Sequence, residues 1–355
     1  MHVKHVNFAK GFRGGERQTL NLIEGVAALG VSQTLVCRPG SELHQRATAA
    51  GIAIRLAGHP LRGHLAGQRS QIIHVHEARG AYWAAIEHAL RGTPYLITRR
   101  IPNPVSGSIA NKFAYKRAAG LVGVSRDVAE RLGFQTGRKV LPILDSCSVH
   151  APDVARVAAI KAELGGGPII GHVGALHDHH KGQSILIAAF QLLTMTYPDA
   201  RLVLLGEGPD RPEFERQANG DPRIFFAGFQ ADVGSWIAAM DVFAFPSREE
   251  GLGSSVLDAM LLGVPVVSST VGGLPELIGA DQRGLMVGGQ DPQAWADAIG
   301  QILENAALRH RLREAARKFA LAHDIAAMTK DYVELYNAIV AAKFSRNTVG
   351  DPLHD

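Results

Sequence analysis

Two carboxylates eight residues apart flank a glycine-rich turn in segment 247–265, SREEGLGSSVLDAMLLGVP. Glu250 lies in the turn, and Asp258 lies in the helix that the apolar spacing predicts over about Ser254–Leu262. Carboxylates so placed can accept hydrogen bonds from sugar or ribose hydroxyls, and the helix start favours an anion such as a diphosphate. The alternative is that the acidic residues only stabilise the helix dipole. The ligand-contacting backbone expected here is that of Gly253, Ser254 and Ser255.

A lysine follows a second glycine-containing loop in segment 169–182, IIGHVGALHDHHKG. The pattern predicts a strand that ends at Gly174 and a helix that Lys181 opens. A lysine there can neutralise a phosphate as a point charge, although a solvated surface lysine is the simpler interpretation. The run His177–His180 is rich in metal-ligand types, but adjacent side chains on one loop do not all converge on one ion. We therefore expect no metal site.

Three further turns place glycines at strand ends, in segments 10–16 (KGFRGGE), 202–209 (LVLLGEGP) and 270–276 (TVGGLPE). Glycine permits close approach of a ligand to the backbone. A turn of this kind on its own is most often only a structural turn. The glycines at these strand ends are Gly14, Gly15, Gly206, Gly272 and Gly273, together with Gly174.

Polar residues also end the predicted strands of the first half. His76 follows the strand Ile72–Val75, and alternation points it to the same side as His74. Arg99 and Arg100 end another strand, where an arginine pair can hold an anionic group of an acceptor or donor. A histidine pair at the edge of the core is the alternative for the first of these groups. Ser125 follows the predicted strand Gly120–Val124.

The second half resembles the donor-binding signature of the retaining glycosyltransferase family 4, the glycosyl transferases group 1. The family pattern is a Glu, seven residues and a second Glu, which Glu250 matches and Asp258 alters by one methylene. The resemblance implies that Glu250 contacts the donor sugar, Asp258 the nucleotide ribose and Lys181 the donor diphosphate. It also implies a donor side lined by Gly14, Gly15, Gly174, Gly206, Gly253, Ser254, Ser255, Gly272 and Gly273, and an acceptor side with His76, Arg99, Arg100 and Ser125. Relatives carry an Arg where this chain has Ala175, and many carry a His where it has Arg100.

Strand and helix patterns alternate along almost the whole chain, which is typical of parallel sheets covered on both faces. The pattern restarts after residue 150, and the resemblance implies a GT-B architecture. We therefore expect an α/β protein with two doubly wound Rossmann-like domains that face a central cleft. The expected parts are an acceptor-side domain 1–150, a donor-binding domain 151–325, and a segment 326–355 that packs back on the first domain and ends in a frayed tail.

Charge is unevenly distributed between the halves. Residues 1–150 carry 20 Lys and Arg against 8 Asp and Glu, a balance of +12, and the remainder carries a balance of −8. A basic half favours an anionic partner, such as a phosphorylated acceptor or an acidic lipid surface. Uneven surface charge without a partner is the alternative. The two cysteines, Cys37 and Cys147, are too few for a disulfide framework and indicate a reducing compartment.

The chain starts without a signal-peptide pattern and lacks an apolar stretch of about 18 residues. We therefore expect a cytoplasmic protein, with peripheral contact at the inner face of an anionic membrane. We expect no cofactor, because the nucleotide sugar is a co-substrate, and no nucleic-acid partner. The resemblance implies a metal-independent, retaining sugar transfer to a glycan, lipid-linked or phosphorylated acceptor, in bacterial envelope or lipopolysaccharide synthesis.

Three other functions fit the same fold. A nucleotide-sugar epimerase needs acid and base carboxylates, for which the first half offers Glu16 and Glu77. A sugar phosphorylase needs a cofactor lysine and a longer chain. A non-catalytic protein that binds a nucleotide sugar is favoured by the departures at Ala175 and Asp258.

Overall fold

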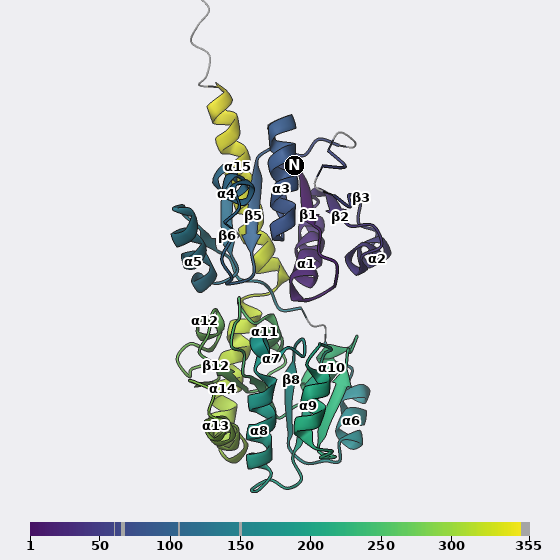
Figure 1. The fold of residues 1–355 in the computed structure, drawn as a ribbon, viewed down its shortest axis with the longest axis vertical. Coiled ribbons are helices and arrows are strands. Elements are labelled where there is room, and N and C mark those ends of the chain that lie inside the picture. Colours follow the sequence, from purple (N-terminus) through teal and green to yellow (C-terminus); the bar gives the residue numbers. More distant parts are fainter. Residues whose placement is uncertain (60, 65–67, 106, 149–150, 349–355) are drawn as a thin grey trace, which may run out of the picture. The chain divides into compact units, whose positions relative to one another are not determined.

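The computed structural model describes residues 1–59, 61–64, 68–105, 107–148 and 151–348, which fall into two compact units (Figure 1). Unit 1 comprises Met1–Ser146 and Ile325–Asp355, and unit 2 comprises Cys147–Asp324. Each unit is built on its own parallel sheet with helices on both faces, so the expected pair of doubly wound α/β sheets is confirmed. Of the expected tail, residues 349–355 lie outside the described residues, as does residue 150 at the expected boundary between 150 and 151.

Unit 1 has a seven-stranded parallel sheet in the order β3-β2-β1-β4-β5-β6-β7. Its strands are β1 His2–Asn7, β2 Ser32–Cys37, β3 Ile54–Leu56, β4 Ile72–Val75, β5 Tyr95–Arg99, β6 Gly120–Gly123 and β7 Leu141–Pro142. Its helices are α1 Gly14–Ala28, α2 Glu42–Ala49, α3 Ala78–Arg91, α4 Ile109–Arg117, α5 Arg126–Thr136 and α15 Ile325–Thr348.

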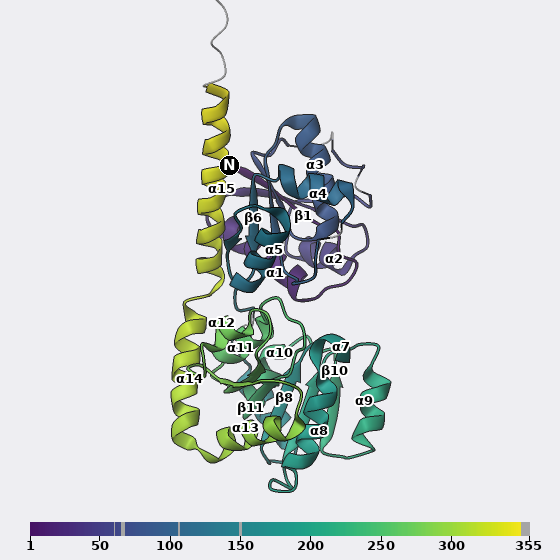
Figure 2. The ribbon, with the colours of Figure 1, turned by 60° about the vertical axis from the view of Figure 1, so that its left-hand side comes forward.

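The long helix α15 covers one face of the unit 1 sheet. Figure 2 shows it lying along this unit, and Tyr332 and Tyr336 pack in one hydrophobic cluster with Val3 and Leu96. Both tyrosines are fully buried, and their hydroxyls have hydrogen-bond partners on the sheet. The last helix of the chain therefore contributes to the same hydrophobic core as the first strand.

Unit 2 has a six-stranded parallel sheet in the order β10-β9-β8-β11-β12-β13. Its strands are β8 Ile169–Val173, β9 Arg201–Leu205, β10 Ile224–Gly228, β11 Val242–Phe245, β12 Val266–Ser269 and β13 Leu285–Val287. Its helices are α6 Val154–Glu163, α7 Asp178–Lys181, α8 Gln183–Leu193, α9 Arg211–Ala218, α10 Val233–Ala239, α11 Ser254–Leu261, α12 Leu274–Ile278, α13 Pro292–Glu304 and α14 Ala306–Leu321.

Local sequence explains where the helices start. Ser125 Oγ accepts a hydrogen bond from Val128 N at the start of α5, and the side chain of Asp153 does the same for α6. Pro292 is the first residue of α13, where the missing N–H costs nothing. Both cysteines are buried free thiols, as expected, and burial raises the pKa of Cys37 to about 11.

Candidate functional site

The two loops that carry Lys181 and Glu250 meet at the point where the strand order of unit 2 reverses. The chain passes from β8 to β9 on one side, and from β11 to β12 on the other, while β8 and β11 are neighbours. Ligands of doubly wound sheets bind outside the carboxyl ends of the strands at such a point. The loops at residues 174–182 and 246–253 therefore occupy the position where a ligand is expected.

Lys181 and Glu250 form an ion pair across these loops. The Lys181 Nζ to Glu250 Oε2 distance is 2.5 Å, although the residues are 69 positions apart in the sequence. The side chains are 21% and 15% exposed, so the pair is half-buried but remains accessible. Lys181 Nζ also lies 4.9 Å from the centroid of the Phe245 ring. The pair places the Lys181 ammonium, which can bind a phosphate, beside the Glu250 carboxylate, which can accept a hydrogen bond from a sugar hydroxyl.

The prediction that a helix starts at Lys181 is wrong in one respect. Lys181 is the last residue of α7, and α8 begins at Gln183. Gly182 separates them in the left-handed conformation, with φ +64°. A Cβ on Gly182 would lie 2.3 Å from the carbonyl oxygen of Pro246, so only glycine lets the two loops pack this closely.

Two other glycines of the expected site, Gly206 and Gly272, make the same kind of loop contact. A Cβ on Gly206 would lie 2.0 Å from the carbonyl oxygen of Gly174, and one on Gly272 would lie 1.8 Å from that of Glu250. Gly253 precedes α11 with φ +94°, and Gly273 precedes α12. Glycine at these places lets backbones of neighbouring loops approach one another, which holds the loops where they end the strands.

Asp258 and the two serines beside Gly253 differ in their surroundings. Asp258 is buried in α11, and its Oδ1 accepts a 2.6 Å hydrogen bond from the backbone N–H of Ser148. Ser255 Oγ donates to the carbonyl oxygen of Val173 at 3.4 Å, and Ser254 is partly exposed at the first position of the helix. Asp258 therefore also fixes the chain segment that enters unit 2.

A set of polar contacts that the motifs did not predict joins α7 to the loop after β11. Arg248 forms an ion pair with Asp178 at 3.1 Å, and His180 Nδ1 lies 3.0 Å from Glu249 Oε2. The backbone N–H groups of Arg248 and Glu249 donate to the carbonyl oxygen of His180 at 2.8 and 3.2 Å. The only feature of the sequence that could have predicted this contact is the opposite charge of side chains on the two loops.

The sheet of unit 1 reverses its order between β1 and β4, and predicted residues lie there too. Gly14 and Gly15 begin α1 after β1, and His76 and Glu77 follow β4. Glu77 caps α3 by accepting from the backbone N–H of Arg79 and Gly80, and it also accepts from Phe8 N.

Glu16 is likewise held by the backbone, because its side chain accepts a 2.9 Å hydrogen bond from Arg13 N. Glu16 and Glu77 are the two carboxylates on which the epimerase alternative depends. Both satisfy backbone donors at helix starts, so the structure gives that alternative no support.

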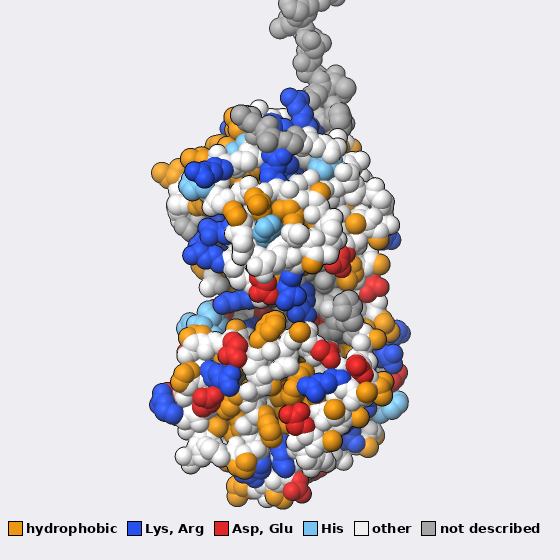
Figure 3. All heavy atoms as spheres, turned by 90° about the vertical axis from the view of Figure 1, so that its right-hand side faces the viewer, with side chains coloured by type: hydrophobic (Ala, Val, Ile, Leu, Met, Phe, Trp, Pro, Cys, Tyr) orange, Lys and Arg blue, Asp and Glu red, His pale blue; other side chains and the backbone are white. Residues whose placement is uncertain are grey.

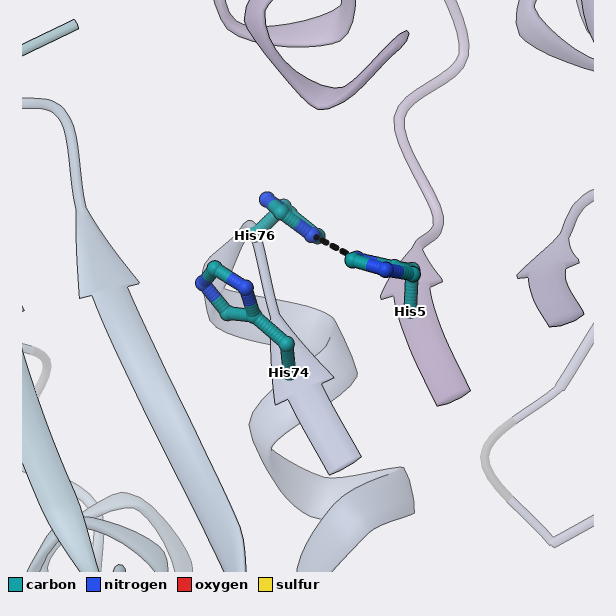
Figure 4. Close-up of side chains that lie close together, drawn as sticks. All are labelled: His5, His74 and His76. Carbon is teal, nitrogen blue, oxygen red and sulfur yellow. Dashed lines mark hydrogen bonds between the residues drawn. The ribbon is translucent and has the colours of Figure 1, made fainter. Parts of the chain in front are cut away.

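Three buried histidines, His5, His74 and His76, lie together in unit 1 (Figure 4). His5 Nδ1 is 2.9 Å from His76 Nε2, and His5 Nε2 is 2.8 Å from Gln33 Oε1. Arg100 Nη1 lies 3.4 Å from His76 Nδ1 and can only donate. His76 therefore donates through Nε2 to His5, and His5 donates to Gln33. This order fixes the tautomers of both rings.

His74 bonds to different partners. Its Nδ1 lies 2.6 Å from the Tyr336 hydroxyl, and its Nε2 lies 2.7 Å from Thr98 Oγ1. Burial lowers the pKa of all three histidines below the ordinary value, and to about 4 for His5. The cluster is therefore a neutral hydrogen-bonded network, and His76, an expected acceptor-side residue, is part of it.

The two expected acceptor-side arginines are held apart by different partners. Arg99 donates to the carbonyl oxygen of Asn103 at 2.5 Å, whereas Arg100 Nε donates to both carboxylate oxygens of Asp145 at 3.2 Å. Both arginines are largely buried, and Ser125 caps α5. Asp145 had no sequence signal, because it is a lone carboxylate in a segment without a motif.

Acidification is expected to destabilise the chain through its buried histidines. The pKa of His5 and of His172, a buried residue of β8, is lowered to about 4. Below the unfolded value of about 6.5 the unfolded chain binds more protons, so the unfolding free energy falls as pH decreases. Each of these histidines is expected to lower the unfolding free energy at pH 5 by about 2 kcal/mol relative to its value at pH 8. Urea unfolding at pH 8, 6.5 and 5 measures this change. The unfolding free energy of the His5→Gln variant is expected to depend less steeply on pH. Equal stability at pH 8 and pH 5 would contradict the assignment.

Two sequence profiles of glycosyltransferases match the chain, one in each half. The profile described as glycosyl transferase 4-like domain matches residues 13–142, and the one described as glycosyl transferases group 1 matches residues 167–305. Both matched ranges contain the loops at the points of strand reversal. The chain belongs to the group 1 glycosyltransferases. The resemblance deduced from the motifs is thereby confirmed.

Named relatives of this group 1 glycosyltransferase act on different molecules. This chain is 34% identical over 183 residues to a D-inositol 3-phosphate glycosyltransferase of Corynebacterium urealyticum, a match that covers 48% of this chain and 43% of the relative. The matched part thus spans less than half the length of that relative. It is 28% identical over 334 residues to a lipopolysaccharide core biosynthesis glycosyltransferase of Rhizobium meliloti, covering 88% of this chain and 92% of the relative.

The fold of this group 1 glycosyltransferase is that of solved structures. HepE of Anabaena, solved in complex with UDP and glucose, has a TM-score of 0.82 at 19% identity, with 95% of this chain and all (100%) of that chain covered. This likeness establishes the GT-B fold. Among the described residues, no helix has both the length and the apolar character to cross a membrane.

Proposed function

We propose that the chain transfers a sugar from a nucleoside diphosphate sugar to an acceptor. The observation that carries this proposal is the Lys181–Glu250 ion pair at the strand reversal of unit 2, with the glycine-packed loops around it. The donor named in the HepE complex, UDP with glucose, fits the same chemistry of a diphosphate and a hydroxylated sugar. The residues proposed to contact the donor are Gly174, Lys181, Gly206, Glu250, Gly253, Ser254, Ser255, Asp258, Gly272 and Gly273.

In the proposed reaction the bond between the anomeric carbon and the diphosphate oxygen breaks, and a bond to an acceptor oxygen forms. The acceptor hydroxyl proton passes to the departing phosphate. Lys181 neutralises the negative charge that grows on the diphosphate, and Glu250 holds the sugar through its hydroxyls. A lysine and a helix start replace a divalent cation in this scheme. We propose retention of configuration, which is what the resemblance to the retaining family 4 implies.

We propose an anionic or lipid-linked glycan acceptor in envelope glycan synthesis, with peripheral contact between unit 1 and an anionic membrane. Figure 3 shows Lys and Arg side chains spread over unit 1 on the face in view, with most Asp and Glu side chains on unit 2. On α4, Ile109 is 88% exposed and Phe113, one turn on, is 51% exposed. Lys112 and Lys116 are exposed on the same short helix. Apolar and cationic side chains so interleaved suit a membrane surface.

Removing the α4 charges is expected to weaken binding to anionic vesicles. The variant with Lys112→Gln and Lys116→Gln should bind about 2 kcal/mol less tightly, or roughly 30-fold, at low salt. Co-sedimentation with vesicles that contain acidic lipid measures this. Lys161→Gln with Lys318→Gln, both exposed on unit 2, is the matched control and should bind as the parent does. Equal binding to neutral vesicles, or no binding to acidic ones, would contradict membrane contact.

The proposed activity is tested by incubating the chain with nucleotide sugars and candidate acceptors, and by following nucleoside diphosphate release and glycan product. Acceptor-dependent release of diphosphate with a new glycoside is the expected result. An epimerised nucleotide sugar formed without acceptor would indicate the epimerase alternative. Tight donor binding without turnover on any acceptor class would indicate a non-catalytic binding protein.

A further inference from the structure

Two groups of potential metal ligands differ in how many of their ligand atoms already have hydrogen-bond partners. In the buried group His5, His74 and His76, every ring nitrogen has a hydrogen-bond partner, and the Arg100 guanidinium lies beside His76. A cation there would have to displace these partners and face a fixed positive charge. That group is therefore a hydrogen-bonded network.

The second group, His179, His180 and Glu249, is open. Their ligand atoms all lie within 4.8 Å of one another, and no side chain of the three is fully buried. Glu249 Oε2 lies 3.0 Å from His180 Nδ1, while the imidazole of His179 has no hydrogen-bond partner among the described residues. Two imidazoles and one carboxylate thus converge on one exposed position.

The backbone holds these three side chains in place. His179 and His180 are consecutive residues of α7, whose last turn is fixed by Gly182. The carbonyl oxygen of His180 accepts hydrogen bonds from Arg248 N and Glu249 N, so α7 and the loop after β11 keep their register. The nearby Arg248 charge is offset by its ion pair with Asp178. The backbone segments that carry the ligands are therefore held together by contacts other than the hydrogen bond between His180 Nδ1 and Glu249 Oε2.

We propose that His179, His180 and Glu249 form a binding site for a transition-metal cation such as Zn²⁺. Imidazole nitrogen with a carboxylate oxygen suits zinc, nickel or copper, whereas Mg²⁺ and Ca²⁺ prefer all-oxygen sites. Three protein ligands leave a fourth position for water. Glu249 precedes Glu250, and His180 precedes Lys181, so the ion clamps together the two backbone segments that carry the ion pair. Metal binding at this site does not itself require a donor or an acceptor.

Zn²⁺ titration of the metal-free, tag-free full chain against a chromophoric chelator tests the proposal. One equivalent is expected to bind, and the affinity is expected to fall at least tenfold in His179→Ala and in Glu249→Gln. His310→Ala, an exposed histidine on α14, is the matched control and should bind as the parent does. Zinc should also raise the thermal midpoint of the parent but not of the two site variants.

Failure to bind zinc, or equal binding by parent and both site variants, would overturn the site. Because binding is read without donor or acceptor, its failure is distinguishable from a failure of the proposed transferase activity. Mg²⁺ in place of Zn²⁺ is expected to give no saturable binding. Saturable Mg²⁺ binding lost in Glu249→Gln but kept in His179→Ala would also contradict the assigned ligand set.

Discussion

Replacing Lys181 with alanine is expected to lower kcat for sugar transfer by about 10²–10³-fold, the usual effect of removing one preorganised group that stabilises charge in a transition state. Lys181 Nζ donates a 2.5 Å hydrogen bond to Glu250 Oε2, and this contact fixes the position of the ammonium group. Glu250→Gln should reduce kcat by a similar factor, because it also removes the carboxylate that keeps the lysine in place. Steady-state kinetics with a saturating nucleotide sugar measures both.

The matched control for this prediction is Lys161→Ala, an exposed lysine on α6 of the same unit. It should leave kcat and the unfolding transition unchanged. A fall in activity in Lys181→Ala with an unfolding free energy within about 1 kcal/mol of the parent separates loss of catalysis from loss of fold. Near-parental turnover in both site variants would remove Lys181 and Glu250 from the proposed active site.

Adding one methyl group at Gly272 is the second large effect expected. In Gly272→Ala the new Cβ would lie 1.8 Å from the carbonyl oxygen of Glu250, at a backbone φ of +57°. The left-handed conformation costs a non-glycine residue about 1–2 kcal/mol, and the overlap adds about 1–3 kcal/mol. The loop that carries Glu250 has to move, so turnover should fall together with the unfolding free energy measured in urea.

A second glycine separates these two contributions. Gly220 has φ +70°, but a Cβ there would have no atom within 4 Å. Gly220→Ala therefore measures the conformational cost alone, and Gly288→Ala, with an ordinary φ and open space, should be near neutral. Equal losses in Gly220→Ala and Gly272→Ala would mean that the loop contact at Gly272 does not constrain the site.

The residue pattern predicted the parallel sheets and the order of the motif loops. It did so because strands of a parallel sheet are continuously apolar and because helix starts carry recognisable caps. The short strands β3, β7 and β13 were missed, since two or three residues give too little periodicity. Lys181 and Glu250 were each predicted as site residues, but their ion pair was not, because it depends on β8 and β11 lying side by side in the sheet.

Side-chain partners could not be predicted in the same way. Arg99 and Arg100 are neighbours in the sequence, yet one bonds to backbone carbonyls and the other to Asp145, 45 residues away. Gly206 and Gly272, which were expected to approach a ligand, instead lie closest to the backbone of neighbouring loops. His179 and His180 become potential metal ligands only because Glu249, from another loop, lies beside them. These contacts depend on tertiary packing, which local patterns do not encode.

The most direct test of the donor site is a thermal-shift panel of nucleoside diphosphates and their sugars, with and without magnesium, on the parent chain and Lys181→Ala. The account predicts that one diphosphate and its sugar stabilise the parent without magnesium, by about 2.7 kcal/mol at a ligand concentration of 100 times Kd. It also predicts that Lys181→Ala loses most of this stabilisation. Absence of stabilisation by every compound, or equal stabilisation of both proteins, would contradict a diphosphate site at Lys181.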